Sequence, residues 1–249
     1  MKYEGIHPTA EIGAGAKVDP SVTIGAFSLI HDNATIGKNT RIGSHCEIGV
    51  PVETEPGGIY IGADSTIRSH SVFYSGSSFG PGMTTGHRVT VREGVQAQEG
   101  LQIGTLSDFQ GRLEIGRHVR THSNVHLGQG ASIGDFVWIF PYVVLTNDPH
   151  PPSEGHLIGV TVEDFAAIAT MTTVLPGITV GRDSLVGAHS LVSRDVPAGH
   201  VVAGVPAKDR GDASTIMLSD GSGPAYPWRR HFHRGYPPED IELWRNEFS

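Results

Sequence analysis

Large apolar residues recur at every sixth position along most of this chain. From Ile61 to Leu145 the sixfold step defines fifteen positions without a slip, and twelve of them carry a large apolar residue. Because 38% of the chain is hydrophobic, chance alone would place such residues at about six of these positions. A period of six fits neither an amphipathic helix nor the alternation of a half-buried strand. It is typical of a hexapeptide β-solenoid.

The geometry of such a solenoid explains the pattern. Each hexad supplies a short strand and a tight corner, and three hexads complete one triangular coil, so residues eighteen apart stack at the inter-strand spacing of ~4.8 Å. Glycine and asparagine recur at and beside the predicted corners, where a positive φ costs them least. A β-sandwich is disfavoured, because its strands do not keep one phase over so many steps. The residue four places after each apolar position is usually small and is also expected to point inward, as in Val119, Val125, Ala131, Val137 and Val143.

The same period runs through most of the remaining chain. Eight hexads lead from Ile6 to Ile48 and six more lead from Val162 to Val192, so that 26 of 29 hexad positions are large and apolar. Since three hexads make one coil, the sequence predicts an all-β fold, a parallel β-helix of about ten coils.

Two interruptions of the period are expected to form loops. The step from Ile48 to Ile61 is one residue too long, and residues 50–58 include two prolines and a Gly-Gly pair, which indicate a bulged loop. Residues 146–161 contain Pro149, Pro151 and Pro152, which cannot donate to a β-ladder. This second segment is therefore predicted to leave the wall of the column.

The repeat pattern ends at Val192, and the following segment is expected to leave the solenoid. The predicted organisation is a β-helix domain over residues 1–208 and a C-terminal linker and tail over residues 209–249. The flat, glycine-dotted faces of such a column usually bury themselves against copies of the same chain, so a homo-oligomer is expected.

The tail is rich in aromatic and basic residues, and a short helix is expected over about 238–247, with Ile241 and Trp244 on one face. Two interpretations of the tail remain open. It packs back on the column or on a neighbouring chain, or else Trp228, His231 or His233 helps to bind a nucleotide or cofactor.

Charge and composition exclude several classes of function. The 249 residues carry 18 Lys+Arg against 26 Asp+Glu, a formal charge of -8, which disfavours binding to nucleic acid or to an anionic membrane surface. No apolar run approaches the ~20 residues of a membrane span. The repeat begins almost at the N-terminus, so no signal peptide is expected, and the single Cys46 fits a reducing compartment. These features favour a cytoplasmic protein.

The isoleucine-led hexads, followed by the ending VLPGITVGRDSLVGAHSLVSRDVPAGHVVAGVPAK, resemble the hexapeptide-repeat acyltransferases. The resemblance implies a left-handed parallel β-helix, a homotrimer and an acyl-CoA or acyl carrier protein donor. The stretches IRSHSVFYSGSSFGPGMTTGHRVTVRE and LTNDPHPP are most similar to N-acetyltransferases that act on amino sugars linked to a nucleotide (dTDP or UDP). Acetyl-CoA is then the expected donor, and no metal is expected.

Acetyl transfer from a thioester to an amine needs a neutral amine, a proton acceptor and a donor for the oxyanion. The candidate catalytic residues are His126 and His150. His126 matches a substrate-contacting histidine of the lipid A pathway UDP-N-acetylglucosamine acyltransferase, whose base is matched here by Gln129, which cannot accept a proton. His150 matches the His-Pro of maltose and galactoside O-acetyltransferases. The amino-sugar N-acetyltransferases have no histidine there, and in them the CoA thiolate could take the proton.

Further residues are candidates for the acceptor. His122 and His126 flank one predicted corner, which contains Asn124, and His87 stacks on the same corner two coils earlier. Asp148 lies in the second predicted loop. Four residues at one hexad position, each eighteen apart, are expected to align vertically, either as the floor of a sugar site or as a solvated corner. The substrate-binding candidates among them are Glu93, Gln129 and Asn147, with Gly111 as a gap.

The resemblance also carries over a cofactor site. Thr170 and Ala188 match small residues beside the pantetheine arm, while Ser193 and Arg194 match residues near the adenine. Lys208 matches a basic residue near the CoA phosphates, which require positive charge.

Other functions share this fold. An O-acetyltransferase acting on a sugar hydroxyl is the main alternative. A γ-type carbonic anhydrase holds Zn²⁺ with three histidines, but His87, His122 and His126 are spaced by 35 and 4, one residue short in each gap. A noncatalytic scaffold that retains CoA affinity is the remaining possibility.

Overall fold

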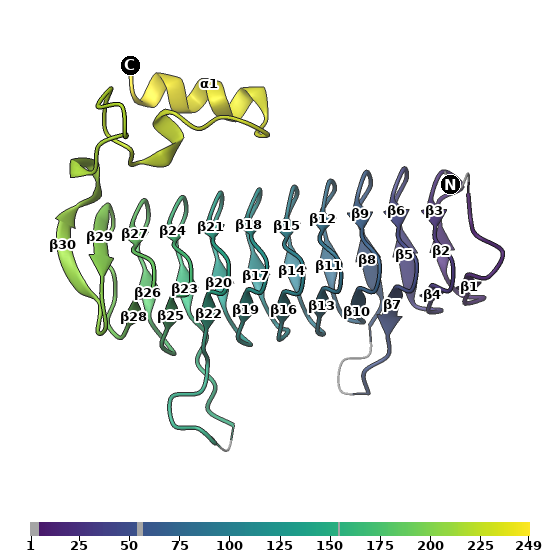
Figure 1. Cartoon of the computed structure of the whole chain (residues 1–249). Helices are drawn as coiled ribbons and strands as arrows, with labels where there is room; N and C mark the ends of the chain where they lie inside the picture. The colour runs from purple at the N-terminus through teal and green to yellow at the C-terminus, as the bar shows by residue number, and fades with distance from the viewer. Residues whose placement is uncertain (1–4, 54–56, 154) are drawn as a thin grey trace.

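The computed structural model describes residues 5–53, 57–153 and 155–249. These residues form a triangular β-solenoid of about ten coils, with three sheets running along its length and a C-terminal tail lying beside it (Figure 1). Every pairing between consecutive coils is parallel, and the predicted solenoid with its short C-terminal helix is confirmed.

Three sheets, named A, B and C here, make the walls of the column. Sheet A contains β3 (Thr23–Ile24), β6 (Arg41–Ile42), β9 (Thr66–Ile67), β12 (Thr84–Thr85), β15 (Gln102–Ile103), β18 (Arg120–Thr121), β21 (Trp138–Ile139), β24 (Ala167–Ile168), β27 (Leu185–Val186), β29 (His200–Ala203) and β30 (Lys208–Asp212). Sheet B contains β1 (Glu11–Ile12), β4 (Leu29–Ile30), β7 (Glu47–Val50), β10 (Val72–Tyr74), β13 (Thr90–Val91), β16 (Asp108–Phe109), β19 (His126–Leu127), β22 (Val144–Leu145), β25 (Thr173–Val174) and β28 (Leu191–Val192). Sheet C contains β2 (Lys17–Val18), β5 (Ala34–Ile36), β8 (Ile59–Ile61), β11 (Ser78–Phe79), β14 (Gln96–Ala97), β17 (Glu114–Ile115), β20 (Ser132–Ile133), β23 (Thr161–Val162) and β26 (Thr179–Val180).

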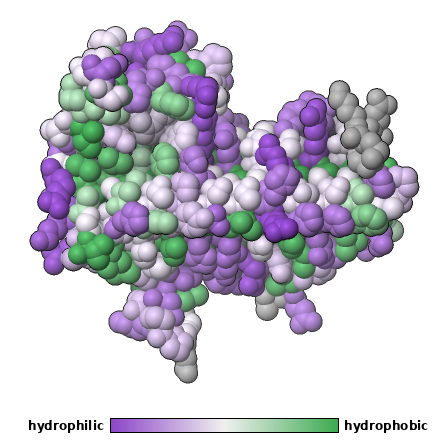
Figure 2. Space-filling model, viewed as in Figure 1, coloured by the Kyte–Doolittle hydropathy of each residue, from purple (hydrophilic) through white to green (hydrophobic). Residues whose placement is uncertain are grey.

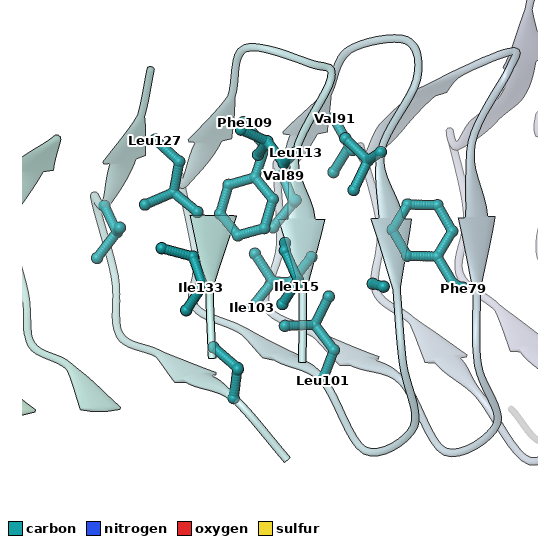
Figure 3. Packing of buried hydrophobic residues seen from close by; sticks show 14 of the residues in the cluster. Phe79, Val89, Val91, Leu101, Ile103, Phe109, Leu113, Ile115, Leu127 and Ile133 are labelled. Carbon is teal, nitrogen blue, oxygen red and sulfur yellow. The ribbon is translucent and has the colours of Figure 1, made fainter. Parts of the chain in front are cut away.

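The interior of the column is a continuous stack of apolar side chains. The hexad residues Phe109 and Leu127 are fully buried, and Figure 3 shows them pointing into the space between the sheets. The residues four places further on are also buried, as predicted: Val119, Val125, Ala131, Val137 and Val143.

Glycine and asparagine do occupy some corners with positive φ, as predicted, but other residue types occupy most of them. Sixteen non-glycine residues of the described chain have positive φ, among them Phe27 and Leu106, so most corners tolerate a side chain in this conformation. Glycine is needed two positions earlier, beside the corner. A Cβ on Gly104 would lie 2.1 Å from the carbonyl carbon of His122 on the next coil. The repeated glycines therefore mainly permit close approach between coils.

Both predicted interruptions project from the column as loops on the side away from the tail (Figure 1). The first lies between β7 and β8, although residues 54–56 of the predicted 50–58 loop lie outside the described residues. The second lies between β22 and β23, and residue 154 is likewise outside the described part. Pairing continues past each loop, since Ser132 pairs with Thr161 in parallel.

The expectation that the chain leaves the solenoid after Val192 is wrong. Val196 forms a parallel bridge with Val180, and β29 pairs in parallel with β27. Val196 and Val202 stay buried in the core, so the apolar filling continues after the sixfold period has ended. β30 then turns back antiparallel on β29 and closes this end of sheet A.

The tail packs on sheet A through a second apolar cluster, which confirms the first interpretation of its aromatic composition. After β30 it forms the short 3-10 helices η1 (Ala213–Thr215) and η2 (Trp228–Arg230) and the helix α1 (Pro238–Glu247), which matches the predicted range. Trp228 and Trp244 are buried against Phe136 and Phe165 of the column. The indole N–H of Trp228 donates to the Phe165 carbonyl at 2.9 Å.

Among the residues described, no helix has the length and apolar character needed to cross a membrane.

Substituting one leucine in the core and one at a corner compares how much each region contributes to the free energy of unfolding. Leu127 is fully buried, whereas Leu106 is 52% exposed at a corner. We expect Leu127→Ala to lower the free energy of unfolding by about 2–5 kcal/mol, because it leaves a cavity. Leu106→Ala should change it by less than about 0.5 kcal/mol. Denaturant unfolding followed by circular dichroism measures both, and equal effects would contradict the inward packing described above.

Candidate functional site

A histidine–carboxylate pair lies on the outer face of sheet B. His126 on β19 and Asp108 on β16 occupy the same position on consecutive coils, because the register pairs residues eighteen apart. The Nδ1 of His126 lies 3.0 Å from Oδ2 of Asp108, and Gln110 donates to the same oxygen at 2.5 Å. The hydrogen bond from His126 holds the pKa of Asp108 below its ordinary value, although burial opposes this. Asp108 therefore stays ionised and orients the ring so that Nε2 is the nitrogen left for a substrate.

An arginine–glutamate pair borders this dyad. Arg92 donates from Nε and Nη2 to the two carboxylate oxygens of Glu93, at 2.9 and 3.0 Å. Burial is the largest single influence and would raise the pKa of Glu93, but the hydrogen bonds from Arg92 and the charges of Arg92 and Arg112 together lower it. The Arg92 charge also contributes to the low pKa of Asp108, so the site is a connected patch of charges.

The predicted polar column is stacked as the eighteen-residue spacing requires. A Cβ on Gly111, whose φ is +90°, would lie 2.5 Å from the Glu93 carbonyl oxygen. Two coils further on, the Asn147 amide donates to the Gln129 carbonyl at 3.4 Å. Gly111 thus leaves a gap in the side-chain column between Glu93 and Gln129.

The second loop rises next to this column. The Asn147 carbonyl accepts from the Ile158 N–H at 2.8 Å and closes the neck of the loop. The Asp148 carboxylate accepts from the N–H groups of His150 and Ser153 at 3.0 and 2.9 Å, and its hydrogen bonds with Ser153 lower its pKa. Asp148 therefore shapes the loop, and the His150 side chain is exposed.

The corner at Asn124 separates His122 from His126. His122 follows β18 on sheet A, and its ring stacks on Phe140 with a centroid distance of 4.9 Å. Burial, followed by the charge of a neighbouring arginine, lowers the pKa of His122. Asn124 has a φ of 59° at the corner itself. Two coils earlier, His87 contacts the Ser69 hydroxyl through Nδ1 at 2.8 Å.

Three of the five predicted cofactor residues meet at the C-terminal end of the column. Ser193, Arg194 and Lys208 line one groove of about 530 Å³. Thr170 and Ala188 lie outside this groove, on adjacent coils, and the Thr170 carbonyl accepts from the N–H of the residue after Ala188 at 2.9 Å.

Sequence reasoning missed Asp108, Gln110 and Arg92. The signal for Asp108 was available, because it precedes His126 by the length of one coil. Gln110 and Arg92 lie on the outer face next to Asp108, but their polar side chains alone do not distinguish them from other solvated positions.

Within residues 5–53, 57–153 and 155–249, no group of three or more His, Cys, Asp or Glu side chains is arranged to hold a metal ion. The histidines considered for a zinc site are therefore not assembled within one chain.

Comparison with known proteins agrees with the repeat and the fold. A 97-residue stretch is 38% identical to the 2,3,4,5-tetrahydropyridine-2,6-dicarboxylate N-acetyltransferase of Staphylococcus aureus (strain JH9), and it covers 39% of this chain and 34% of the relative. The chain thus spans about a third of the length of the curated relatives it matches. The UDP-N-acetylglucosamine acyltransferase from Campylobacter jejuni has the same fold, with a TM-score of 0.55 and 18% identity, and the match covers 98% of this chain and 82% of that one.

Residues 15–49 match the family described as Bacterial transferase hexapeptide (six repeats). The same sixfold period continues through the column to Val192. The chain is therefore a hexapeptide-repeat solenoid, and its residues 15–49 are similar to the repeats of bacterial transferases.

Proposed function

We propose that this protein is a CoA-dependent N-acyltransferase that transfers an acetyl group to the amine of a nucleotide-linked amino sugar. The observation that carries the proposal is the Asp108–His126 pair on the outer face of sheet B. A histidine oriented by a carboxylate is a typical general base, and residues 15–49 of the same column match a family of bacterial transferases.

The proposed reaction has one bond-forming and one bond-breaking event. The acceptor nitrogen attacks the thioester carbonyl carbon, a C–N bond forms, and the C–S bond breaks to release CoA thiolate. Nε2 of His126 takes the proton from the nitrogen and returns it to the thiolate. Asp108 stabilises the imidazolium that forms in between, since its lowered pKa keeps it charged.

The donor is assigned to the C-terminal groove. Arg194 and Lys208 supply positive charge for the CoA phosphates, and Thr170 and Ala188 leave room for the pantetheine arm at the corner. The groove and the His126 site are on the same column, so an extended donor would run along its axis from one toward the other.

Transfer to nitrogen is favoured over transfer to oxygen by the named activity of the staphylococcal relative, an N-acetyltransferase. On the acceptor side, Glu93, Gln129 and Asn147 form the polar column next to the dyad, and His150 contacts the acceptor from the loop. Further contacts with the acceptor are proposed for His87, His122, Asn124 and Asp148.

We also propose that the protein is a homotrimer whose active sites lie at the seams between subunits. The corner between sheets A and B carries exposed apolar side chains on several coils, which is unusual for a solvated edge. Phe27 is 63% exposed, and Leu106 and Tyr142 are each 52% exposed. This ridge leads directly to the strand that carries His126.

An acetyl-CoA thiol-release assay against dTDP- and UDP-linked amino sugars tests the acceptor. We expect turnover with at least one of them and none with the matching sugars that bear a hydroxyl in place of the amine. Turnover of free hexoses alone would replace N-acylation by O-acetylation, and turnover of a small amino dicarboxylate alone would exclude the sugar.

The base is tested with the active acceptor. We expect His126→Ala to lower kcat by about 10²–10⁴-fold, because the amine proton loses its acceptor. Asp108→Asn should lower kcat less, and His150→Ala should mainly raise the KM of the acceptor. His31→Ala is the matched control, since His31 forms a similar pair with Glu47 on the same sheet, at 3.0 Å. Unchanged kcat in His126→Ala would assign the proton to the CoA thiolate instead.

Light scattering coupled to gel filtration tests the trimer. The wild-type protein is expected at three times its chain mass of 26.5 kDa, and the double variant Leu106→Asp/Tyr142→Asp at one, because it places charge in the apolar seam. Leu243→Asp, on an exposed position of α1, should leave the mass unchanged. A monomeric wild-type protein would contradict the proposal.

A further inference from the structure

A cleft lies where the tail meets sheet A, away from the His126 face. It consists of two adjoining cavities of about 410 and 370 Å³, which share His122, Trp138 and Arg234. The tail forms a lobe over the C-terminal half of the column, as Figure 2 shows. One end of the cleft is cationic and the other is aromatic.

Arginines dominate the first end. Arg68 and Arg120 from sheet A and Arg234 from the tail line it, and no Asp or Glu is among the described residues lining either cavity. None of the ion pairs formed by the described residues includes any of these three arginines. In a chain with 26 acidic residues, three arginines without a carboxylate around one cavity indicate a place for an external anion.

Arg120 is the clearest case of an arginine whose charge has no carboxylate partner. Its Nη2 donates to the carbonyls of Arg234 and Gly235 at 3.2 and 2.8 Å, and its guanidinium lies 4.0 Å from the ring centre of Tyr236. These contacts join the tail to the column, but they do not neutralise the charge. The buried Nε of Arg120 has no hydrogen-bond acceptor among the described residues. Burial lowers the pKa of Arg120, and the charge of Arg234 lowers it further, while Tyr236 opposes this.

The second end of the cleft offers flat aromatic surfaces. Trp138 and Phe140 come from the column, and Tyr226, Trp228 and Phe232 come from the tail. The Trp138 and Phe232 rings meet edge to face, with centroids 5.5 Å apart, which holds the wall in one geometry. Such a wall binds planar heterocycles by stacking, and stacking accepts many different bases.

We propose that this cleft binds a nucleoside phosphate, with the base against the aromatic wall and the phosphate between Arg68, Arg120 and Arg234. The two cavities adjoin, so one ligand can fill both. Guanidinium groups match phosphate oxygens in bidentate geometry, and the aromatic end excludes water from the base. Neither an inorganic anion nor an apolar molecule uses both ends.

The cleft lies on a different wall of the column from the proposed catalytic pair, and of the acceptor contacts proposed above only His122 also lines it. The cleft is built on β9, β12, β15, β18 and β21 of sheet A with the tail, whereas His126 and Asp108 belong to sheet B. Ligand binding can therefore be measured without acyl donor or turnover. A failure of the proposed transferase activity leaves this measurement unaffected.

Intrinsic fluorescence and calorimetry test the proposal on the full-length protein with UMP as the probe. The three tryptophans of the chain, Trp138, Trp228 and Trp244, all belong to the cluster at the aromatic end, so UMP should quench their emission. We expect UMP to bind at least about tenfold more tightly than uridine or ribose 5-phosphate, each of which fills one end only.

Two exposed arginines provide variants that leave the fold intact. Arg68→Gln and Arg234→Gln should each weaken UMP binding by about tenfold, since each removes a charge-assisted hydrogen bond. Arg245→Gln, on an exposed position of α1 outside the cleft, is the matched control and should bind UMP like the wild type. UMP binding no tighter than that of uridine, or equal binding by the double variant Arg68→Gln/Arg234→Gln, would overturn the proposal.

Discussion

The ladder of backbone hydrogen bonds between consecutive coils is the interaction on which every other feature depends. The Asp108 N–H donates to the Val125 carbonyl and the His126 N–H to the Val143 carbonyl, each at 2.9 Å. Similar bonds recur along all three walls, so a separation of eighteen residues in the chain becomes contact between neighbouring rungs. Columns of like or complementary side chains therefore form wherever the sequence repeats a residue type at that distance.

The ladder also explains why a solenoid of two-residue strands can hold a reactive group steadily. His126 points outward while its neighbour Leu127 is fully buried, and the strand is bonded on both sides by β16 and β22. An outward side chain on such a strand has little freedom to move, and Asp108 fixes its remaining rotation. Sites supported in this way keep their geometry better than sites on isolated loops.

Much of the fold could be predicted from the sequence, because the period of six appears in the identity of residues such as Ile103 and Phe109. The end of the repeat could not, because Val196 and Val202 fill the core out of phase with the preceding hexads. The Asp108–His126 pair follows the eighteen-residue rule, because the two residues hold the same position on adjacent coils, but the hydrogen bond between their side chains is visible only in the fold. The contact of Arg120 with Gly235 spans 115 residues and follows no period, so only the folded tail reveals it.

The loop between β22 and β23 shows how such a scaffold accommodates change. Ser132 and Thr161 are paired although they are twenty-nine residues apart, eleven more than one coil requires, and the rungs before and after remain in register. The number of residues in this loop can therefore vary, whereas the register of the strands on either side is fixed. A lineage could lengthen, shorten or exchange this segment to suit a different acceptor without redesigning the frame, which separates the evolution of selectivity from the evolution of stability.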